Sequence, residues 1–215
     1  MASARAVLFD FSGTLAALQA RDGWFTGTGL DVAQRAEVMN RLTHPTATVT
    51  HHAWEYRDLD PALHRQAYLH VLKTSGLGDD HAEQLYQRVT DPAQWTLYPD
   101  TAFVLKSLRQ NGIRTAVVSN IAWDIRTVLT AAGADADEYV LSFEVGVAKP
   151  DPRIFTEALA RLAVPAAEAL MVGDSEENDG AARQLGCDFA RVDPLPINDR
   201  PTGLVAALRD RGLSL

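Results

Sequence analysis

The sequence predicts an α/β protein in which a parallel sheet forms the core and a small α-helical segment is inserted after the first strand. Two observations point to this class. Short apolar runs that stop abruptly at polar residues alternate with helical stretches, which is the pattern of a parallel sheet covered by helices. One long segment near the N-terminus breaks this alternation and reads as helical.

Five runs are expected to be strands. Each is apolar almost throughout, as is typical of strands that are buried on both faces of a sheet. The first run ends at Asp10, and the next three are followed by serine or glycine. The expected strands are 6–9, 115–118, 139–141, 169–172 and 189–192.

Helices are expected between and after these strands. Asp100 is a suitable N-cap for a helix over 101–111, and Gly112 is a suitable stop. The other expected helices are 123–132, 152–162, 177–185 and 201–211.

The inserted segment is expected to form a separate helical domain of residues 16–95. The core domain would then consist of residues 1–15 and 96–215. The insertion holds all six histidines of the chain. A polar stretch with one proline, 43–50, is expected to be a linker. Helix-like spacing is clearest around Met39 and Leu42, around 64–73 and around 82–89.

The composition argues against several kinds of partner. The chain has 215 residues and a net charge of −8, whereas nucleic acids and anionic membranes attract a basic surface. No apolar run is long enough to span a membrane, and the N-terminal segment does not read as a signal peptide. We therefore expect a cytoplasmic monomer or homodimer that binds neither nucleic acid nor membrane.

Polar side chains collect where the expected strands end. One such residue alone would be read as a turn or a helix cap. Ligands of open parallel sheets bind beyond the carboxyl ends of the strands, so four polar strand ends together indicate one crevice. The residues concerned are Asp10, Ser12, Thr14, Ser119, Asn120, Lys149, Asp174, Ser175 and Asp179.

Three of these residues predict a metal site. Two carboxylates about 4 Å apart repel by roughly 4 kcal/mol at an effective dielectric constant of about 20. Lys149 alone cannot offset the three carboxylates of Asp10, Asp174 and Asp179. A divalent cation can, and oxygen ligands favour Mg²⁺ over softer metals. With Mg²⁺ bound, Asp10 can attack a phosphorus atom that neighbouring donors hold in place.

Four segments, in this order, resemble the sequence motifs of the haloacid dehalogenase-like hydrolases. They are Asp-Phe-Ser-Gly-Thr-Leu at 10–15, Val-Ser-Asn at 118–120, Ala-Lys-Pro-Asp-Pro-Arg-Ile-Phe at 148–155 and Val-Gly-Asp-Ser-Glu-Glu-Asn-Asp at 172–179. The resemblance implies a Rossmann-like core with an inserted helical cap of the C1 type. It also implies phosphatase-like activity on a small phosphorylated metabolite.

The resemblance further implies a role for each matching residue. Asp10 would be the nucleophile that forms an aspartyl-phosphate, and the catalytic group would comprise Asp10, Ser12 and Lys149. The metal ligands would be Asp10, the backbone carbonyl of Ser12, Asp174 and Asp179. The phosphate-binding residues would be Gly13, Thr14, Ser119, Asn120 and Lys149.

Position 12 departs from the family pattern. Most phosphatases of this family carry a second aspartate there, which protonates the leaving alcohol and then activates water. Ser12 is a poor acid or base near neutral pH, and such help is worth about 10²–10⁴-fold in rate. One hypothesis is a phosphatase whose acid comes from the cap, from water or from the substrate. His51, His52 and His64 are the candidates in the cap.

Two alternatives stay open. A 2-haloacid dehalogenase-type hydrolase needs no acid for a halide, although Asp174 and Asp179 retain a metal site that halide displacement does not require. A weakly active or non-catalytic relative would only bind a phosphorylated ligand. The second acidic residue of the metal site is itself ambiguous, since Asn178 competes with the favoured Asp179. Trp123 is a candidate for the wall of the pocket.

Overall fold

A five-stranded parallel sheet forms the centre of the protein, with the strand order β5-β4-β1-β6-β7. The computed structural model describes residues 4–43 and 52–215. All five expected strands are confirmed to within one residue at each end. They are β1 (Ala6–Phe9), β4 (Arg114–Ser119), β5 (Glu138–Leu141), β6 (Ala169–Gly173) and β7 (Asp188–Arg191).

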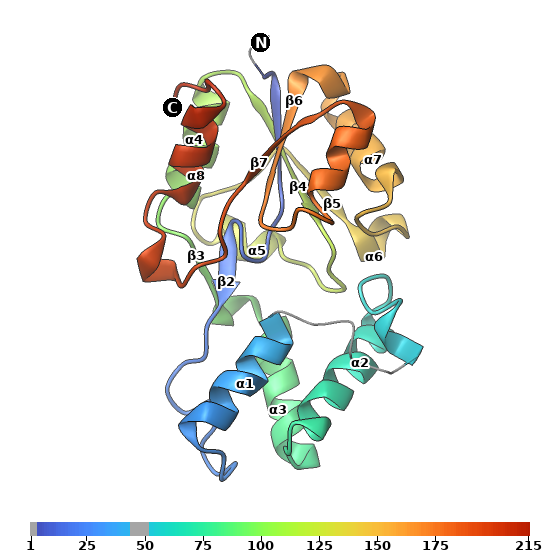
Figure 1. Ribbon diagram of the computed structural model, residues 1–215, viewed down its shortest axis with the longest axis vertical. Coiled ribbons are helices and arrows are strands. Elements are labelled where there is room, and N and C mark those ends of the chain that lie inside the picture. Colours follow the sequence, from blue (N-terminus) through green and yellow to red (C-terminus); the bar gives the residue numbers. More distant parts are fainter. Residues whose placement is uncertain (1–3, 44–51) are drawn as a thin grey trace.

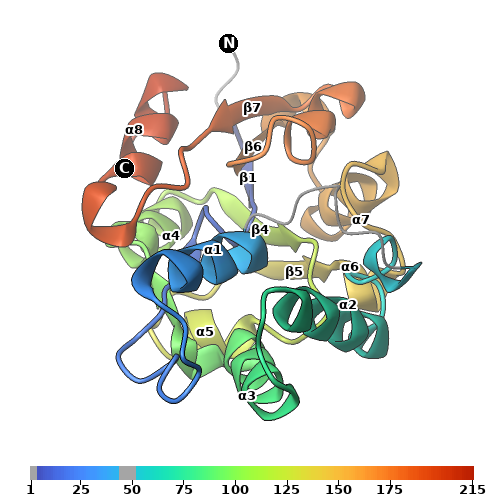
Figure 2. The same ribbon diagram turned by 60° about the horizontal axis from the view of Figure 1, so that its bottom comes forward.

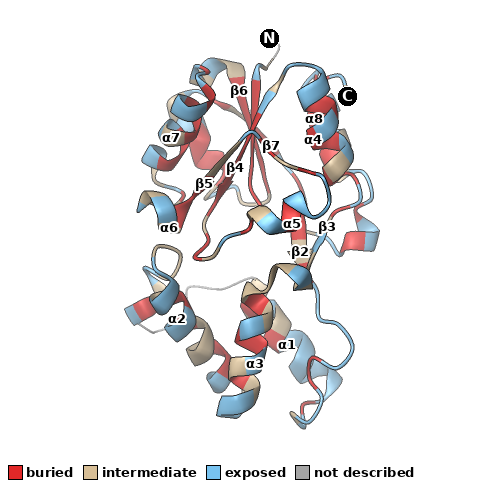
Figure 3. Ribbon diagram, turned by 180° about the vertical axis from the view of Figure 1, so that it is seen from behind, coloured by how far each residue is buried: buried red, intermediate tan, exposed pale blue. Residues whose placement is uncertain are grey.

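The two faces of the sheet are covered by different helices (Figure 1). Val7 and Phe9 of β1 belong to one apolar core, whereas Ala6 and Leu8 belong to the other, because successive side chains of a strand point to opposite faces. Both faces of the strands are buried (Figure 3). The first core contains α4 (Thr101–Gln110), α5 (Arg126–Thr130) and α8 (Gly203–Asp210); the second contains α7 (Pro152–Leu162) and the 3-10 helix η4 (Gly180–Leu185).

Two expected helices differ from the observed ones. Helix α5 starts later than expected, since the side chain of Asp124 accepts the backbone N–H of Arg126 in a turn. The segment 177–185 is not an α-helix but a turn followed by η4. Here the side chains of Ser175 and Asp179 accept backbone N–H groups of the turn, and such local bonds compete with helix formation.

The N-cap expectation for Asp100 is only half right. Asp100 does precede α4, but its side chain makes no capping bond to that helix. Its Oδ2 atom instead accepts the backbone N–H groups of Leu204 and Val205 in the first turn of α8. Helices α4 and α8 are thereby fixed to each other on one face of the sheet.

Three helices lie beyond the carboxyl ends of the strands, and we call them the cap helices (Figures 1 and 2). They are α1 (Val32–Thr43), α2 (Pro61–Thr74) and α3 (Asp79–Thr90). The side chain of Asp60 accepts backbone N–H groups of Ala62 and Leu63, which sets the start of α2. Residues of all three helices, with Trp24 and Phe25, form a third apolar core.

Two short strands join the cap helices to the sheet. Strands β2 (Ala16–Leu18) and β3 (Trp95–Leu97), which no pattern in the sequence predicts, pair antiparallel. The expected division of the chain at 15/16 and 95/96 stays a prediction, and residues 44–50 of the expected linker lie outside the described residues. Among the described helices, none is long and apolar enough to cross a membrane.

Further short elements complete the chain. Helix α6 (Ser142–Val145) follows β5 directly. The remaining elements are the 3-10 helices η1 (His52–Trp54), η2 (Pro92–Gln94), η3 (Ala166–Glu168) and η5 (Ile197–Asp199).

Candidate active site

Asp10 stands at the end of the central strand β1, where its backbone N–H donates to the carbonyl of Val172 in β6. The chain then turns sharply at Gly13, whose φ angle is +78°. A Cβ atom at Gly13 would lie 2.4 Å from Oδ2 of Asp174. Glycine is therefore required here both by the backbone conformation and by the close approach of the second carboxylate.

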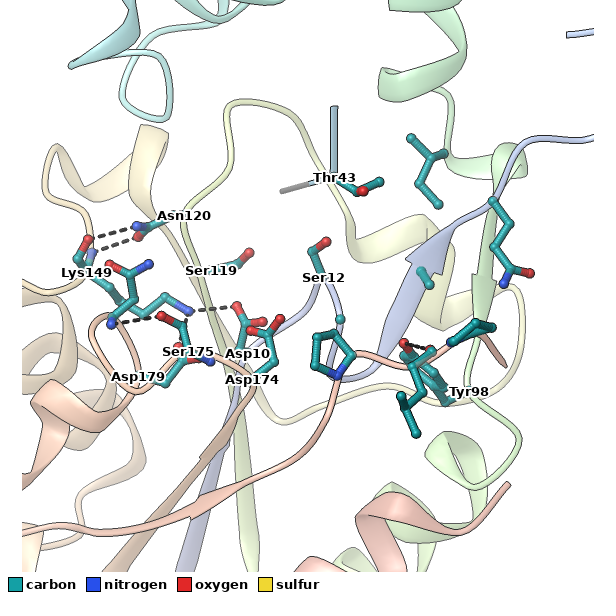
Figure 4. A pocket seen from close by; sticks show the side chains of 18 of the residues that line it. Asp10, Ser12, Thr43, Tyr98, Ser119, Asn120, Lys149, Asp174, Ser175 and Asp179 are labelled. Atoms are coloured by element: carbon teal, nitrogen blue, oxygen red, sulfur yellow. Dashed lines mark hydrogen bonds and ion pairs between the residues drawn. The ribbon is translucent and has the colours of Figure 1, made fainter. Parts of the chain in front are cut away.

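Lys149 is buried between two carboxylates. Its Nζ atom lies 2.7 Å from Oδ1 of Asp10 and 2.7 Å from Oδ1 of Asp179 (Figure 4). The side chain of Asn120 brackets the backbone of Lys149: its Nδ2 donates to the lysine carbonyl at 2.8 Å, and its Oδ1 accepts the lysine N–H at 2.7 Å. Asn120 thus holds the loop that carries the ammonium group, in addition to lining the cavity.

The loop after β6 supplies the other acids. Oδ2 of Asp179 accepts the backbone N–H of Ser175 at 3.0 Å. A Cβ atom at Gly173 would lie 2.2 Å from that same Oδ2 atom, so the last residue of β6 has to be glycine. Asn178, the competing candidate, also lines the cavity, but it is Asp179 that lies in the acidic cluster.

Asp10, Asp174 and Asp179 form this cluster. Each offers a carboxylate oxygen, and the three oxygens lie within 4.8 Å of one another. The one ammonium group of Lys149 contacts two of them and leaves a net negative site. Such an all-oxygen donor set with excess negative charge suits a hard divalent cation. The residues that the sequence singled out are therefore brought together at one point.

The protonation of Asp10 depends on this balance of charges. Burial raises the pKa of Asp10 to about 7; Lys149 opposes the shift, and Asp179 and Asp174 add to it. Burial also disfavours the charge on Lys149, but the two neighbouring carboxylates outweigh it and raise the pKa of the ammonium group. Lys149 therefore stays charged, and further positive charge in the cluster would favour the ionised, nucleophilic form of Asp10.

The other expected phosphate-binding residues differ in position. Ser119, the last residue of β4, lines the main cavity together with Ser12 and Gly13. Thr14, in contrast, is fully buried, and its hydroxyl donates to Oδ2 of Asp10 at 3.2 Å. In this structure Thr14 contacts Asp10 instead of lining the cavity.

Arg200 supports the first loop from a distant part of the chain, and sequence reasoning missed it. Its Nη1 donates to the carbonyl of Gly13 at 2.8 Å, and its Nη2 donates to the carbonyl of Thr14. Its guanidinium group stacks on the ring of Tyr98, 3.3 Å from the ring centroid. No local sequence signal marks Arg200, because it belongs to none of the recognised motifs.

Two spaces with several lining residues in common lie beside these groups. The main cavity has a volume of about 550 Å³ and is lined by Asp10, Lys149 and Asp174 (Figure 4). A smaller chamber of about 160 Å³ lies toward the cap helices and shares several lining residues with the main cavity. Trp123 lines this smaller chamber, close to its expected position at the pocket wall.

Of the histidine candidates, His64 fits poorly as a proton donor. His64 of α2 is buried, its Nδ1 lies 3.1 Å from the hydroxyl of Tyr86, and burial lowers its pKa to about 3. It is therefore neutral at ordinary pH. His52 is exposed in η1, and His51 lies outside the described residues.

The fold and the site define a class of protein. A family model described as haloacid dehalogenase-like hydrolase matches residues 4–186. The chain therefore belongs to the haloacid dehalogenase-like hydrolase family, and its α/β core is the Rossmann-like fold expected from the sequence.

The chain is similar in sequence to several named proteins. The chain is 38% identical over 118 residues to "Haloacid dehalogenase-like hydrolase domain-containing protein 3" of Mus musculus, covering 52% of this chain and 47% of the relative. It is 32% identical over 134 residues to "Phosphoserine phosphatase" of Thermus thermophilus, covering 60% and 53%. The chain thus spans about half the length of these curated relatives.

A solved structure agrees with this assignment. The 2-haloacid dehalogenase of Pseudomonas syringae is 26% identical, with a TM-score of 0.53, and the match covers 88% of this chain and 86% of that one. The fold is therefore shared by relatives named for either of two reactions, and only the site can distinguish between them.

Proposed function

We propose that this protein is a Mg²⁺-dependent phosphatase that hydrolyses a small phosphorylated metabolite in the cytoplasm through Asp10. The observation that carries this proposal is the buried arrangement of Lys149 between Asp10 and Asp179, with Asp174 in the same cluster. A nucleophilic carboxylate, a fixed cation and a surplus of acidic oxygens are the components of phosphoryl transfer to aspartate.

The acidic cluster is the proposed metal site. Asp10, Asp174, Asp179 and the backbone carbonyl of Ser12 would hold Mg²⁺, which supplies Lewis-acid stabilisation of the phosphoryl oxygens when it is bound. The cluster fits this ion because its described donors are carboxylate oxygens and its charge exceeds what Lys149 can offset.

The protein's own groups would then act in sequence. A carboxylate oxygen of Asp10 attacks the phosphorus atom, and the bond between phosphorus and the leaving-group oxygen breaks. Lys149 and Ser119 hold the phosphoryl oxygens. Water then attacks the phosphorus of the aspartyl-phosphate, which releases inorganic phosphate and restores the Asp10 carboxylate. Phosphatase-named relatives support this reading.

Halide displacement is the second candidate function. Serine at position 12 and the likeness to a dehalogenase structure favour it. Against it stands the acidic cluster of Asp10, Asp174 and Asp179, because displacement of a halide by carboxylate needs no metal ion. Binding of a phosphorylated ligand without turnover is the third outcome to be tested.

The decisive experiment is a substrate screen of the purified protein with Mg²⁺ and with a chelator. The panel contains phosphorylated metabolites, an aryl phosphate and 2-haloacids, and Asp10→Asn is the matched inactive control. We expect phosphate release that requires both Mg²⁺ and Asp10. Halide release that persists in the chelator would contradict the proposal, as would ligand binding without any turnover.

A further inference from the structure

The smaller chamber shares part of its lining with the main cavity. Its volume of about 160 Å³ equals about five water molecules at liquid density. Ser12, Arg57 and Asn120 line both spaces, so the chamber and the main cavity adjoin beside Ser12 in the loop after β1. Among the described residues that line the chamber, Asp58 is the only carboxylate.

We propose that Asp58 is the acid–base residue that replaces the aspartate missing at position 12, an inference that rests on the proposed phosphatase function. The observation behind it is that Asp58 and Ser12 line the same chamber, one from the cap side and one from the core. The carboxylate that is absent from the loop after β1 would thus come from a residue 46 positions after Ser12.

Arg57 holds the carboxylate of Asp58 in place. One terminal nitrogen of Arg57 lies 3.2 Å from Oδ2 of Asp58, and the other donates to the carbonyl of Trp54 at 2.7 Å. The guanidinium group also lies 4.2 Å from the centroid of the Trp54 ring. Through these contacts Arg57 can position the carboxylate of Asp58.

A contact with the core fixes the same segment from the other side. The hydroxyl of Ser142, directly after β5, donates to the backbone carbonyl of Asp58. The same hydroxyl accepts the backbone N–H of Ile121 at 2.8 Å, next to Asn120. Asp58 is therefore tied to the loop beside the nucleophile, although it belongs to the segment that leads into the cap helices.

The surroundings of Asp58 suit a carboxyl group that gains and loses a proton. Burial raises its pKa above the ordinary value, and the charges of Arg57 and Lys149 limit the rise. The titratable side chains that line the chamber from α2 are His64 and Tyr68. Burial lowers the pKa of His64, which therefore lacks the proton of an imidazolium, and raises the pKa of Tyr68, which makes its hydroxyl a weaker acid than usual.

The proton balance of the two steps is simple. As Asp10 bonds to phosphorus, the carboxyl group of Asp58 gives its proton to the leaving-group oxygen and becomes a carboxylate. In the second step this carboxylate takes a proton from the water that attacks phosphorus. Asp58 is then protonated again, Asp10 is free, and inorganic phosphate leaves.

The test uses p-nitrophenyl phosphate with Mg²⁺, whose good leaving group needs no acid in the first step. We expect Asp58→Asn to release p-nitrophenol in a burst as Asp10 becomes phosphorylated. Steady turnover should then be about 10²–10⁴-fold slower than in the wild type, because water lacks its base. Adding Ser12→Asp to this variant should restore turnover.

Controls separate this inference from other effects. Asp80→Asn changes an exposed acid of α3 and should leave turnover unchanged, and Asp58→Glu should retain part of it. Unchanged steady turnover in Asp58→Asn would overturn the inference, and so would equal loss of burst and turnover without rescue by Ser12→Asp. Magnesium-dependent turnover by the wild type tests the phosphatase proposal separately, since it does not depend on which residue is the base.

Discussion

Replacing Asp10 should stabilise the metal-free protein. Burial and the neighbouring acids raise the pKa of Asp10 from 3.8 to about 7, so the folded state holds this proton more tightly than the unfolded state. The proton on folded Asp10 stabilises the protein fully below the pKa of the unfolded state. This stabilisation is lost as the pH rises through the pKa of the folded state. Over that whole range the loss amounts to about 4 kcal/mol.

The amide of Asp10→Asn does not ionise and escapes this loss. The free energy of unfolding of the variant, taken relative to that of the wild type, should rise by about 2 kcal/mol as the pH goes from about 5.5 to about 8. Lys149 keeps Asp179 as its partner in the variant, so its charge is not left unpaired. Activity and stability therefore oppose each other at this position.

Urea unfolding followed by tryptophan fluorescence, with a chelator present, measures the effect at both pH values. The exposed acid of Asp80→Asn should show no comparable change. Excess Mg²⁺ should reduce the difference, because an ion at 100 times its Kd stabilises the wild type by about 2.7 kcal/mol and binds less well without the Asp10 carboxylate. If Asp10→Asn were no more stable than the wild type near pH 8 without metal, the charge balance described for the cluster would be wrong.

Three further predictions concern the loop after β1 and its support. Gly13→Ala should abolish magnesium-dependent turnover, since its Cβ would meet Oδ2 of Asp174 at 2.4 Å. Gly112 is the matched control, because it also has a positive φ but nothing lies near its Cβ position. Gly112→Ala should lose about 1–2 kcal/mol of stability and keep its activity in the same assays. Arg200→Met should leave two loop carbonyls without their donors, lower stability by about 1–3 kcal/mol and raise the Mg²⁺ concentration needed for half-maximal activity; an unchanged magnesium titration would argue against its supporting role. Ser12→Asp added to Asp58→Asn should speed hydrolysis of alkyl phosphates more than that of aryl or acyl phosphates, and equal effects on both would refute the missing-acid explanation.

Much of the fold could be predicted because its signals are local. An apolar run that ends at a polar residue determines where a buried strand stops, and the five strands were placed to within one residue. The helical boundaries were less accurate where side chains bonded to nearby backbone groups, as Asp124 and Asp179 do. Strands β2 and β3 carry no such signal, because three residues each are too few to show alternation.

The sequence by itself determined which groups gather around Asp10, since parallel strands bring their carboxyl ends to one edge of the sheet. Asp10, Lys149, Asp174 and Asp179 could be placed there from order alone. Only the tertiary structure decided what supports and completes them. Arg200 reaches Gly13 across 187 positions of the chain, and Asp58 enters the chamber because the cap segment folds back against Ser142. Such contacts depend on how distant segments pack, and no local pattern of residues encodes them.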